Sequence, residues 1–334
     1  MNVQSILCLQ SFIAISQHTG VNSSPQTTSA IIRASSDSVQ FHCVAKLKAV
    51  DAVVNESSFS NDRRLLATAS EDETVRLWDV DSKQCIATLK HHIDVVTSCK
   101  FSPDDTLVAS ASSDGNVRLW DVKSHRCVIT GKCHRQCANS CAFSDDGAVL
   151  ASASDDKTVR LWNMKTFMNL ATLRGHTKGV DGCDISREEI LASTSSDKTV
   201  RLWDMNTQQC ITALNGHTDT CNKCCFTAAG TLLASTSYDN TVRLWDTRTR
   251  HSIATLEGSY EYTWQCSFSS DGTWIAAGCS GDDVARVWDV KTLRCIASLQ
   301  HDYCVYACSF SSNGMIATAS YDNEESDIVA HLWE

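Results

Sequence analysis

Histidine, serine and aspartate recur together along this sequence in a combination that can catalyse acyl transfer. In many hydrolases these three residue types serve as the base, the nucleophile and the orienting group. Four sets share nearly the same spacing: His92, Ser110 and Asp114; His134, Ser152 and Asp156; His176, Ser193 and Asp197; His217, Ser235 and Asp239. A single active site needs only one set, so four copies at one repeated position indicate architecture. We therefore predict no catalytic residues and no enzymatic activity.

Cysteine and histidine also gather with spacings that suggest zinc binding. Cys133, His134, Cys137 and Cys141 form one group, and a second comprises His217, Cys221 and Cys224. Structural zinc ligands usually come as closely spaced pairs in turns. Here Cys137 and Cys141 share one face of a strand at a period of two, and both histidines belong to the sets above. We predict no metal and no cofactor.

The elements that must position these side chains are marked by a recurring tryptophan. Seven tryptophans close a short strand-like run at intervals of 41 to 45 residues: Trp78, Trp120, Trp162, Trp203, Trp245, Trp288 and Trp333. Aspartate follows the tryptophan in five of the seven units. Self-similarity at this period is the signature of a repeat architecture.

Each unit predicts four short strands separated by polar turns. In the second unit they are Val95–Phe101, Leu107–Ser112, Val117–Asp121 and Cys127–Thr130, with Ser-Asp-Gly-Asn before the third. Four antiparallel strands per repeat are typical of a propeller blade. The predicted fold is all-β, a seven-bladed β-propeller over residues 41–334. Residues 1–40 read as a flexible Ser/Thr-rich segment.

The order of strand types predicts how the ring closes. The segment Phe41–Leu47 matches the fourth strand of other units, because Cys43–Leu47 aligns with Cys85–Leu89. The last element, Val329–Trp333, is a third strand. Pairing these two ends completes the final blade and removes two exposed strand edges.

Over roughly residues 41–334 the chain resembles the WD-repeat β-propeller family, on the strength of its VRLWD-like strands and turn aspartates. The resemblance implies the same closure, and in each blade a buried relay from tryptophan Nε1 through Ser or Thr and His to the turn aspartate. By position the relay residues are His92, Asp114 and Trp120; His134, Asp156 and Trp162; His176, Asp197 and Trp203; His217, Asp239 and Trp245. Val50 and Ser259 replace the histidine in the first and sixth units, and His301 fits the seventh.

The chain has 18 cysteines, and 11 of them fall on two repeated strand positions. Six lie near the end of first strands and five open last strands, where we expect cysteine to act as a small buried hydrophobe. Disulfide-dense proteins are small secreted domains that lack a core. We therefore expect reduced thiols and a cytoplasmic or nuclear location.

Charge and hydropathy exclude two classes of partner. The formal net charge is −10, without a Lys/Arg block, whereas nucleic-acid binding needs a basic stripe. No apolar run approaches the roughly 20 residues that span a bilayer. We predict binding to neither nucleic acid nor membrane.

A partner surface is predicted at one end of the propeller. Strands alternate in direction, so the loop entering each first strand and the turn between strands two and three emerge together at the channel mouth. All six tyrosines map there, within residues 238–321, and Trp264 joins them. The opposite arc is acidic. The predicted partner-binding residues are Tyr238, Tyr262, Trp264, Tyr306, Asp155, Asp181 and Glu71. The alternative is that some of these rings only pack locally.

These observations predict a non-catalytic protein–protein interaction scaffold or adaptor: a monomeric propeller within a larger complex. Its partner would be a peptide or protein carrying Arg or Lys beside an apolar residue. One alternative is a substrate receptor of a cullin-RING ubiquitin ligase, because Trp245-Asp246-Thr247-Arg248 resembles the WDxR pattern of such receptors. Another is a peptide reader in a nuclear or cytoplasmic complex.

Overall fold

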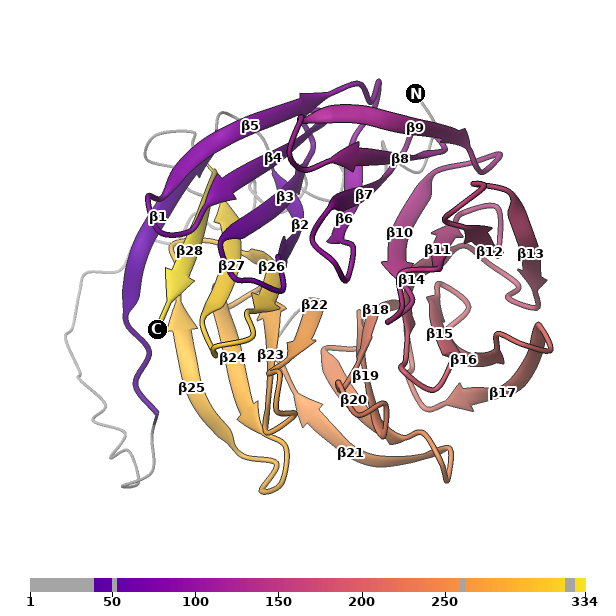
Figure 1. Cartoon of the computed structure of the whole chain (residues 1–334). Coiled ribbons are helices and arrows are strands. Elements are labelled where there is room, and N and C mark those ends of the chain that lie inside the picture. Colours follow the sequence, from indigo (N-terminus) through magenta and orange to yellow (C-terminus); the bar gives the residue numbers. More distant parts are fainter. Residues whose placement is uncertain (1–38, 50–52, 259–261, 322–327) are drawn as a thin grey trace, which may run out of the picture. The chain divides into compact units, whose positions relative to one another are not determined.

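The computed structural model describes residues 39–334 except 50–52, 259–261 and 322–327. These residues form seven antiparallel sheets of four strands each (Figure 1). The first strands of blades 1 to 7 are β2 (Val54–Phe59), β6 (Val96–Phe101), β10 (Ala138–Phe143), β14 (Val180–Ile185), β18 (Cys221–Phe226), β22 (Thr263–Phe268) and β26 (Val305–Phe310). The second strands are β3 (Leu65–Ser70), β7 (Leu107–Ser112), β11 (Val149–Ser154), β15 (Ile190–Ser195), β19 (Leu232–Ser237), β23 (Trp274–Cys279) and β27 (Ile316–Tyr321).

The outer half of each blade holds the tryptophan strand and its neighbour. The third strands are β4 (Thr74–Asp79), β8 (Asn116–Asp121), β12 (Thr158–Asn163), β16 (Thr199–Asp204), β20 (Thr241–Asp246), β24 (Val284–Asp289) and β28 (Ile328–Trp333). The fourth strands are β5 (Gln84–Lys90), β9 (Arg126–Lys132), β13 (Asn169–Arg174), β17 (Gln209–Asn215), β21 (His251–Glu257), β25 (Cys295–Gln300) and, for blade 7, β1 (Cys43–Ala49).

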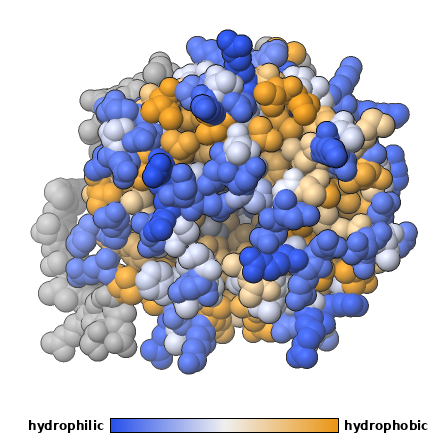
Figure 2. Space-filling model, in the orientation of Figure 1, coloured by the Kyte–Doolittle hydropathy of each residue, from blue (hydrophilic) through white to orange (hydrophobic). Residues whose placement is uncertain are grey.

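The blades form a closed ring with the first strands innermost. Each first strand contacts the first strand of the next blade, and β26 contacts β2 (Figure 1). Second strands are almost wholly buried because their Ala, Ser and Thr side chains let neighbouring blades approach on both faces. The core lies between blades, where tryptophan and leucine of one blade pack on the next. On the surface seen in Figure 2, hydrophilic side chains predominate, with hydrophobic ones visible between them.

The predicted closure is confirmed. Strand β1 pairs with β28 in antiparallel register from Cys43↔Trp333 to Ala49↔Ile328, and His42 and Glu334 exchange two further backbone hydrogen bonds. Leu47 is 1% exposed in the interface between blades 7 and 1. The strand begins two residues later than predicted and also includes Lys48 and Ala49, because pairing continues along the whole of β28. The predicted flexible segment 1–40 lies outside the described residues except for its last two.

One prediction about cysteine burial is wrong. The six first-strand cysteines are buried as expected: Cys99, Cys141, Cys183, Cys224, Cys266 and Cys308. Of the five cysteines predicted to be buried on fourth strands, Cys43, Cys85, Cys210 and Cys295 are exposed and Cys127 is half-buried. The fourth strand is outermost and packs through one face only, so its alternate side chains meet solvent. No disulfide joins the described cysteines.

Candidate binding face at the channel mouth

The four predicted His–Asp–Ser–Trp sets are hydrogen-bonded relays. In blade 4, Trp203 Nε1 donates to Ser193 Oγ at 2.8 Å, and His176 lies 2.8 Å from Ser193 through Nε2 and 2.9 Å from Asp197 through Nδ1. The other three sets have the same connections within 2.7–3.0 Å: Trp120–Ser110–His92–Asp114, Trp162–Ser152–His134–Asp156 and Trp245–Ser235–His217–Asp239. The two bonds to each histidine fit a ring that donates from Nδ1 to the carboxylate and accepts at Nε2 from the hydroxyl.

The burial of these four sets and the pKa of their aspartates are those of structural groups. The four histidine side chains are at most 1% exposed. Burial alone would raise the pKa of each turn aspartate, but hydrogen bonds from the histidine and neighbouring groups hold it well below its ordinary value. The serine hydroxyls of these four sets are buried, and each serine oxygen accepts from an indole N–H, so none of the four is accessible to a substrate.

Blades 1 and 7 keep only part of the relay. In blade 1, Trp78 Nε1 donates to Thr68 Oγ1 at 3.0 Å, while Asp72 pairs with Arg76. In blade 7, Trp333 Nε1 donates to Thr318 Oγ1 at 2.8 Å, and Thr318 lies 3.0 Å from His301 Nε2. Here Ser320, at 3.0 Å from His301 Nδ1, takes the place of the aspartate. Val50 and Ser259 fall outside the described residues.

His176→Ala should lower the free energy of unfolding by about 1–3 kcal/mol, because Ser193 and Asp197 would each lose a buried partner. Urea denaturation followed by tryptophan fluorescence measures the change. His251, an exposed histidine on β21, supplies a matched control that should change stability little. Equal effects of the two substitutions would contradict a structural relay.

The histidines of the two zinc-like groups are already engaged by other partners. His134 uses both ring nitrogens in its relay, and so does His217. Burial raises the pKa of the Cys141 thiol to about 12, which disfavours the thiolate that zinc needs. Within the described residues, no three His, Cys, Asp or Glu side chains are placed to hold a metal ion.

The channel-mouth face is defined by two repeated positions: the residue that follows each second strand and the second residue of each first strand. In six blades the amide at the first position donates to the carbonyl that precedes the first strand, over 2.9–3.1 Å: Glu71→Val53, Ser113→Val95, Asp155→Cys137, Ser196→Gly179, Tyr238→Thr220 and Ser280→Tyr262. All seven first strands shift register at their second residue, as a bulge does. Bulges re-aim side chains. The shared geometry places these positions at one end of the ring.

The four predicted aromatic residues meet on this face across blades 5, 6 and 7. Tyr238 lies 4.7 Å from Tyr262 and 5.3 Å from Trp264 between ring centroids, and Trp264 lies 5.6 Å from Tyr306. Tyr262 is 45% exposed, and the other three are half-buried. Their tilted and edge-on contacts are the geometries that aromatic pairs prefer. Tyr260 and the side chain of Tyr321 fall outside the described residues.

Trp264 differs from the six tryptophans whose relay bonds are described above. Each relay indole described above donates to a serine or threonine, whereas the Nε1 of Trp264 is covered and has no acceptor among the described residues. A covered donor without a partner costs about 1–3 kcal/mol.

Two of the predicted carboxylates, Asp155 and Asp181, lie between blades 3 and 4, on the same face as the aromatic cluster. Asp155 and Asp181 occupy the same two positions as Tyr238 and Trp264. Asn139 Nδ2 donates to Asp155 at 2.8 Å, and Ser196 Oγ donates to Asp181 at 2.8 Å. Burial, together with the nearby Asp155, raises the pKa of Asp181 to about 7. Gly179 makes room for this pair, because a Cβ there would stand 2.8 Å from Asp155 Oδ1.

Glu71 holds the equivalent position in blade 1 and does not join the pair. Its side chain is exposed, and partial loss of water raises its pKa. The channel-mouth face therefore carries an aromatic cluster (Tyr238, Tyr262, Trp264 and Tyr306), a carboxylate pair (Asp155 and Asp181) and a separate glutamate.

Sequence comparison assigns the family. The family model for the WD domain, G-beta repeat, matches seven segments: residues 41–79, 83–121, 125–163, 167–204, 208–246, 250–289 and 293–324. The chain belongs to the WD40-repeat family. Each matched segment but the last spans the fourth strand of one blade and the first three strands of the next, so the interlock of β1 with blade 7 is part of the repeat. WD40 propellers are typically protein-interaction scaffolds and are generally non-catalytic.

A search of curated proteins found no match. Within the described residues there is no helix of the length and apolarity that a membrane crossing requires.

The channel of this WD40 propeller holds an ion cluster that sequence analysis missed. Glu56 is 2% exposed and accepts from Lys100 at 2.7 Å, from Lys223 at 3.1 Å and from Gln265 at 3.3 Å. Burial alone would raise the pKa of Glu56, but the two ammonium groups hold it below its ordinary value. These bonds cross the channel between blades 1, 2, 5 and 6. The signal in the sequence is the third residue of the first strand. It is Glu56, Lys223 or Gln265 in blades 1, 5 and 6, and Ser, Gly or Ala in the other four blades.

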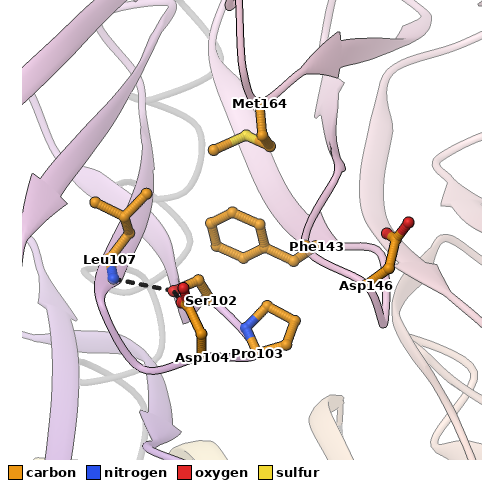
Figure 3. A pocket seen from close by; sticks show the side chains of 8 residues that line it. Ser102, Pro103, Asp104, Leu107, Phe143, Asp146 and Met164 are labelled. Atoms are coloured by element: carbon orange, nitrogen blue, oxygen red, sulfur yellow. Dashed lines mark hydrogen bonds between the residues drawn. The ribbon is translucent and has the colours of Figure 1, made fainter.

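A cavity of about 290 Å³ lies between blades 2 and 3, at the opposite end from the channel mouth (Figure 3). It is lined by Ser102, Pro103, Asp104, Leu107, Phe143, Asp146, Gly147 and Met164. Asp104 accepts from Ser102 and Thr106, and Asp146 accepts from Ser144 and Ala148. Both carboxylates accept hydrogen bonds within their own turns, so we interpret the cavity as a gap in the packing between two turns rather than as a binding site.

Arg248, which suggested the ligase-receptor alternative, is exposed in the turn between β20 and β21. This turn lies at the end opposite the channel mouth, because third-to-fourth turns and second-to-third turns point in opposite directions. Asp246 caps the turn by accepting from the Thr249 amide at 2.6 Å, and the equivalent aspartates of other blades do the same. The ligase-receptor role stays a prediction.

The pKa of Asp181 predicts how stability depends on pH. The folded state keeps the Asp181 proton up to about pH 7, whereas the unfolded chain releases it near pH 3.8, so this group makes stability fall as pH rises between those values. Asp181→Asn should therefore raise the free energy of unfolding by about 1–3 kcal/mol at pH 8 and by little at pH 4. Urea denaturation at both pH values measures this, with the exposed Asp94→Asn as control. An Asp181→Asn effect independent of pH would contradict the assignment.

Proposed function

We propose that this WD40 protein is a non-catalytic scaffold that binds a peptide or protein segment across the channel mouth. The observation that carries the proposal is the aromatic cluster, in which the covered indole N–H of Trp264 has no acceptor among the described residues. Tyrosine and tryptophan in partly exposed clusters form the centres of protein interfaces. At the corresponding positions the other blades carry Ser, Asn, Thr, Asp or Glu.

The carboxylate pair adds a preference for a cation. Asp155 and Asp181 stand at the same junction positions as Tyr238 and Trp264, two junctions around the ring. Arg or Lys in the partner would pair with these carboxylates while a neighbouring apolar side chain contacts the rings. The ion cluster at Glu56 bridges the channel below the mouth, which favours a partner that lies across the opening. Such a protein acts within a larger cytoplasmic or nuclear complex.

Selection from a random peptide library tests this proposal. We expect wild-type protein to enrich peptides with Arg or Lys next to an apolar residue, and Asp155→Asn/Asp181→Asn protein to keep the apolar preference but lose the basic one. Enrichment of acidic peptides, or of peptides whose binding is unchanged by substitutions on the channel-mouth face, would overturn the proposal.

A further inference from the structure

Two thiols from neighbouring blades lie side by side next to the channel. Cys225 of β18 and Cys266 of β22 have their sulfur atoms 3.5 Å apart, although 41 residues separate them in the chain. Cys266 is buried, and Cys225 is half-buried. A disulfide requires a sulfur–sulfur distance of about 2.05 Å, so the two atoms need to approach by about 1.5 Å.

The repeat architecture sets the direction of the Cys225 side chain. Cys225 is the fifth residue of its first strand, and in blades 4, 6 and 7 the side chain at this position reaches the first strand of the next blade. Asp184 accepts from the Phe226 amide at 2.7 Å, and Ser267 accepts from the Phe310 amide at 3.1 Å. At this position cysteine occurs only in blade 5; the other blades have Ser58, Lys100, Ala142, Asp184, Ser267 and Ser309. The thiol pair therefore follows from one residue placed in a geometry that the ring repeats.

We propose that Cys225 and Cys266 form a reversible disulfide between blades 5 and 6 when the protein meets a peroxide. This inference goes beyond the proposed binding function and does not depend on it. It adds a modification site to a propeller whose described cysteines are otherwise thiols.

The two thiols have different roles in the reaction. Cys225 is half-buried and Cys266 is buried, so peroxide reaches Cys225 first. The hydrogen bond to Cys225 and burial also raise the pKa of the Cys266 thiol, which disfavours its thiolate. The Cys225 thiolate attacks hydrogen peroxide, the O–O bond breaks, and sulfenic acid forms with loss of hydroxide, which takes up the thiol proton as water. The Cys266 sulfur then attacks the sulfenic sulfur, the S–O bond breaks, and the Cys266 proton leaves with the hydroxide as a second water. Two thiols and one peroxide give one disulfide and two waters.

The bond would constrain the junction that holds the aromatic cluster. Strand β22 carries Trp264 two residues before Cys266, and the carbonyl of Trp264 accepts from Thr236 Oγ1 of blade 5 at 2.7 Å. A covalent link between the innermost strands also restricts the unfolded chain, which stabilises the folded state. We expect oxidation to raise the melting temperature by several degrees and reductant to reverse it.

Peptide mapping of the intact, reduced protein after hydrogen peroxide treatment and thiol alkylation tests the proposal. We expect a linked peptide containing Cys225 and Cys266 in the wild type and in Cys295→Ser, a control that removes an exposed thiol on β25. The linked peptide should be absent from Cys225→Ser and from Cys266→Ser. In Cys266→Ser, a sulfenic-acid probe should label Cys225.

Two results would overturn the inference. One is oxidation of exposed cysteines such as Cys295 without any Cys225–Cys266 link. The other is a melting temperature that rises on oxidation equally in wild type and in Cys225→Ser. The serine variants keep side-chain size, and their melting temperatures under reducing conditions show whether the fold is retained. If Cys266→Ser does not fold, Cys225→Ser and Cys225→Ala still give the decisive comparison.

Discussion

Trp264→Ala is expected to weaken the binding of a library-selected peptide by about 30-fold or more, corresponding to at least ~2 kcal/mol for a central aromatic anchor. The ring contacts Tyr238, Tyr262 and Tyr306, so its removal opens the middle of the cluster. Fluorescence anisotropy with a labelled peptide measures the dissociation constant. Tyr306→Ala should weaken binding in the same direction, because it removes one wall of the cluster.

Two controls distinguish loss of the binding surface from loss of the fold. Lys123 and Lys291 are exposed in third-to-fourth turns at the opposite end of the ring, and their replacement by alanine should leave the affinity unchanged. The melting temperature of Trp264→Ala should stay close to that of wild type, because the side chain is half-buried and its covered N–H has no acceptor among the described residues, so that its removal offsets part of the lost packing. If the lysine variants lose the peptide and the aromatic variants keep it, the binding surface lies at the other end.

The sequence predicted the fold well because each repeat carries its own local evidence. The tryptophan, the turn aspartate and the small-residue strand recur with the blade, and seven copies average out the ambiguity of any one strand. The relays were equally predictable, since in every complete unit the tryptophan lies 10 residues after the serine and the histidine 17 or 18 residues before it. The aromatic cluster followed from the same reasoning, because repeat positions translate directly into positions around the ring.

The errors and omissions concern features that the repeat does not encode. Burial of Cys85 and Cys295 was wrong because a fourth strand has a solvent face, and its pattern is weaker than that of the inner strands. The ion pair of Glu56 with Lys223 joins residues 167 positions apart across the channel. No local pattern predicts such a contact, and neither does one predict that Cys225 faces Cys266. These contacts depend on which single residues depart from the repeat and on where the ring brings them.

Deleting residues 1–48 should destabilise the propeller strongly, whereas deleting 1–35 should change its stability little. The longer deletion removes β1 except Ala49, so β28 would become an exposed edge with unpaired backbone groups. It also removes Leu47, whose loss from a buried site is comparable to a large-to-small core substitution of about 2–5 kcal/mol. We expect a drop in melting temperature of at least about 6 °C, with increased light scattering from edge-to-edge association.

The shorter deletion is the matched control, because it leaves every described strand in place. Leu47→Ala provides an intermediate case if the longer deletion does not fold: it should lower the melting temperature while keeping the backbone pairing of β1 with β28. Equal melting of the two truncated proteins would mean that β1 contributes nothing to blade 7, and the closure argument would fail. The ring closes within blade 7, where β1 from the N-terminal part of the chain pairs with β28. Stability should therefore depend more on residues 43–49 than on any comparable stretch of an outer strand, because the other fourth strands are joined to their blades by a short turn as well as by pairing.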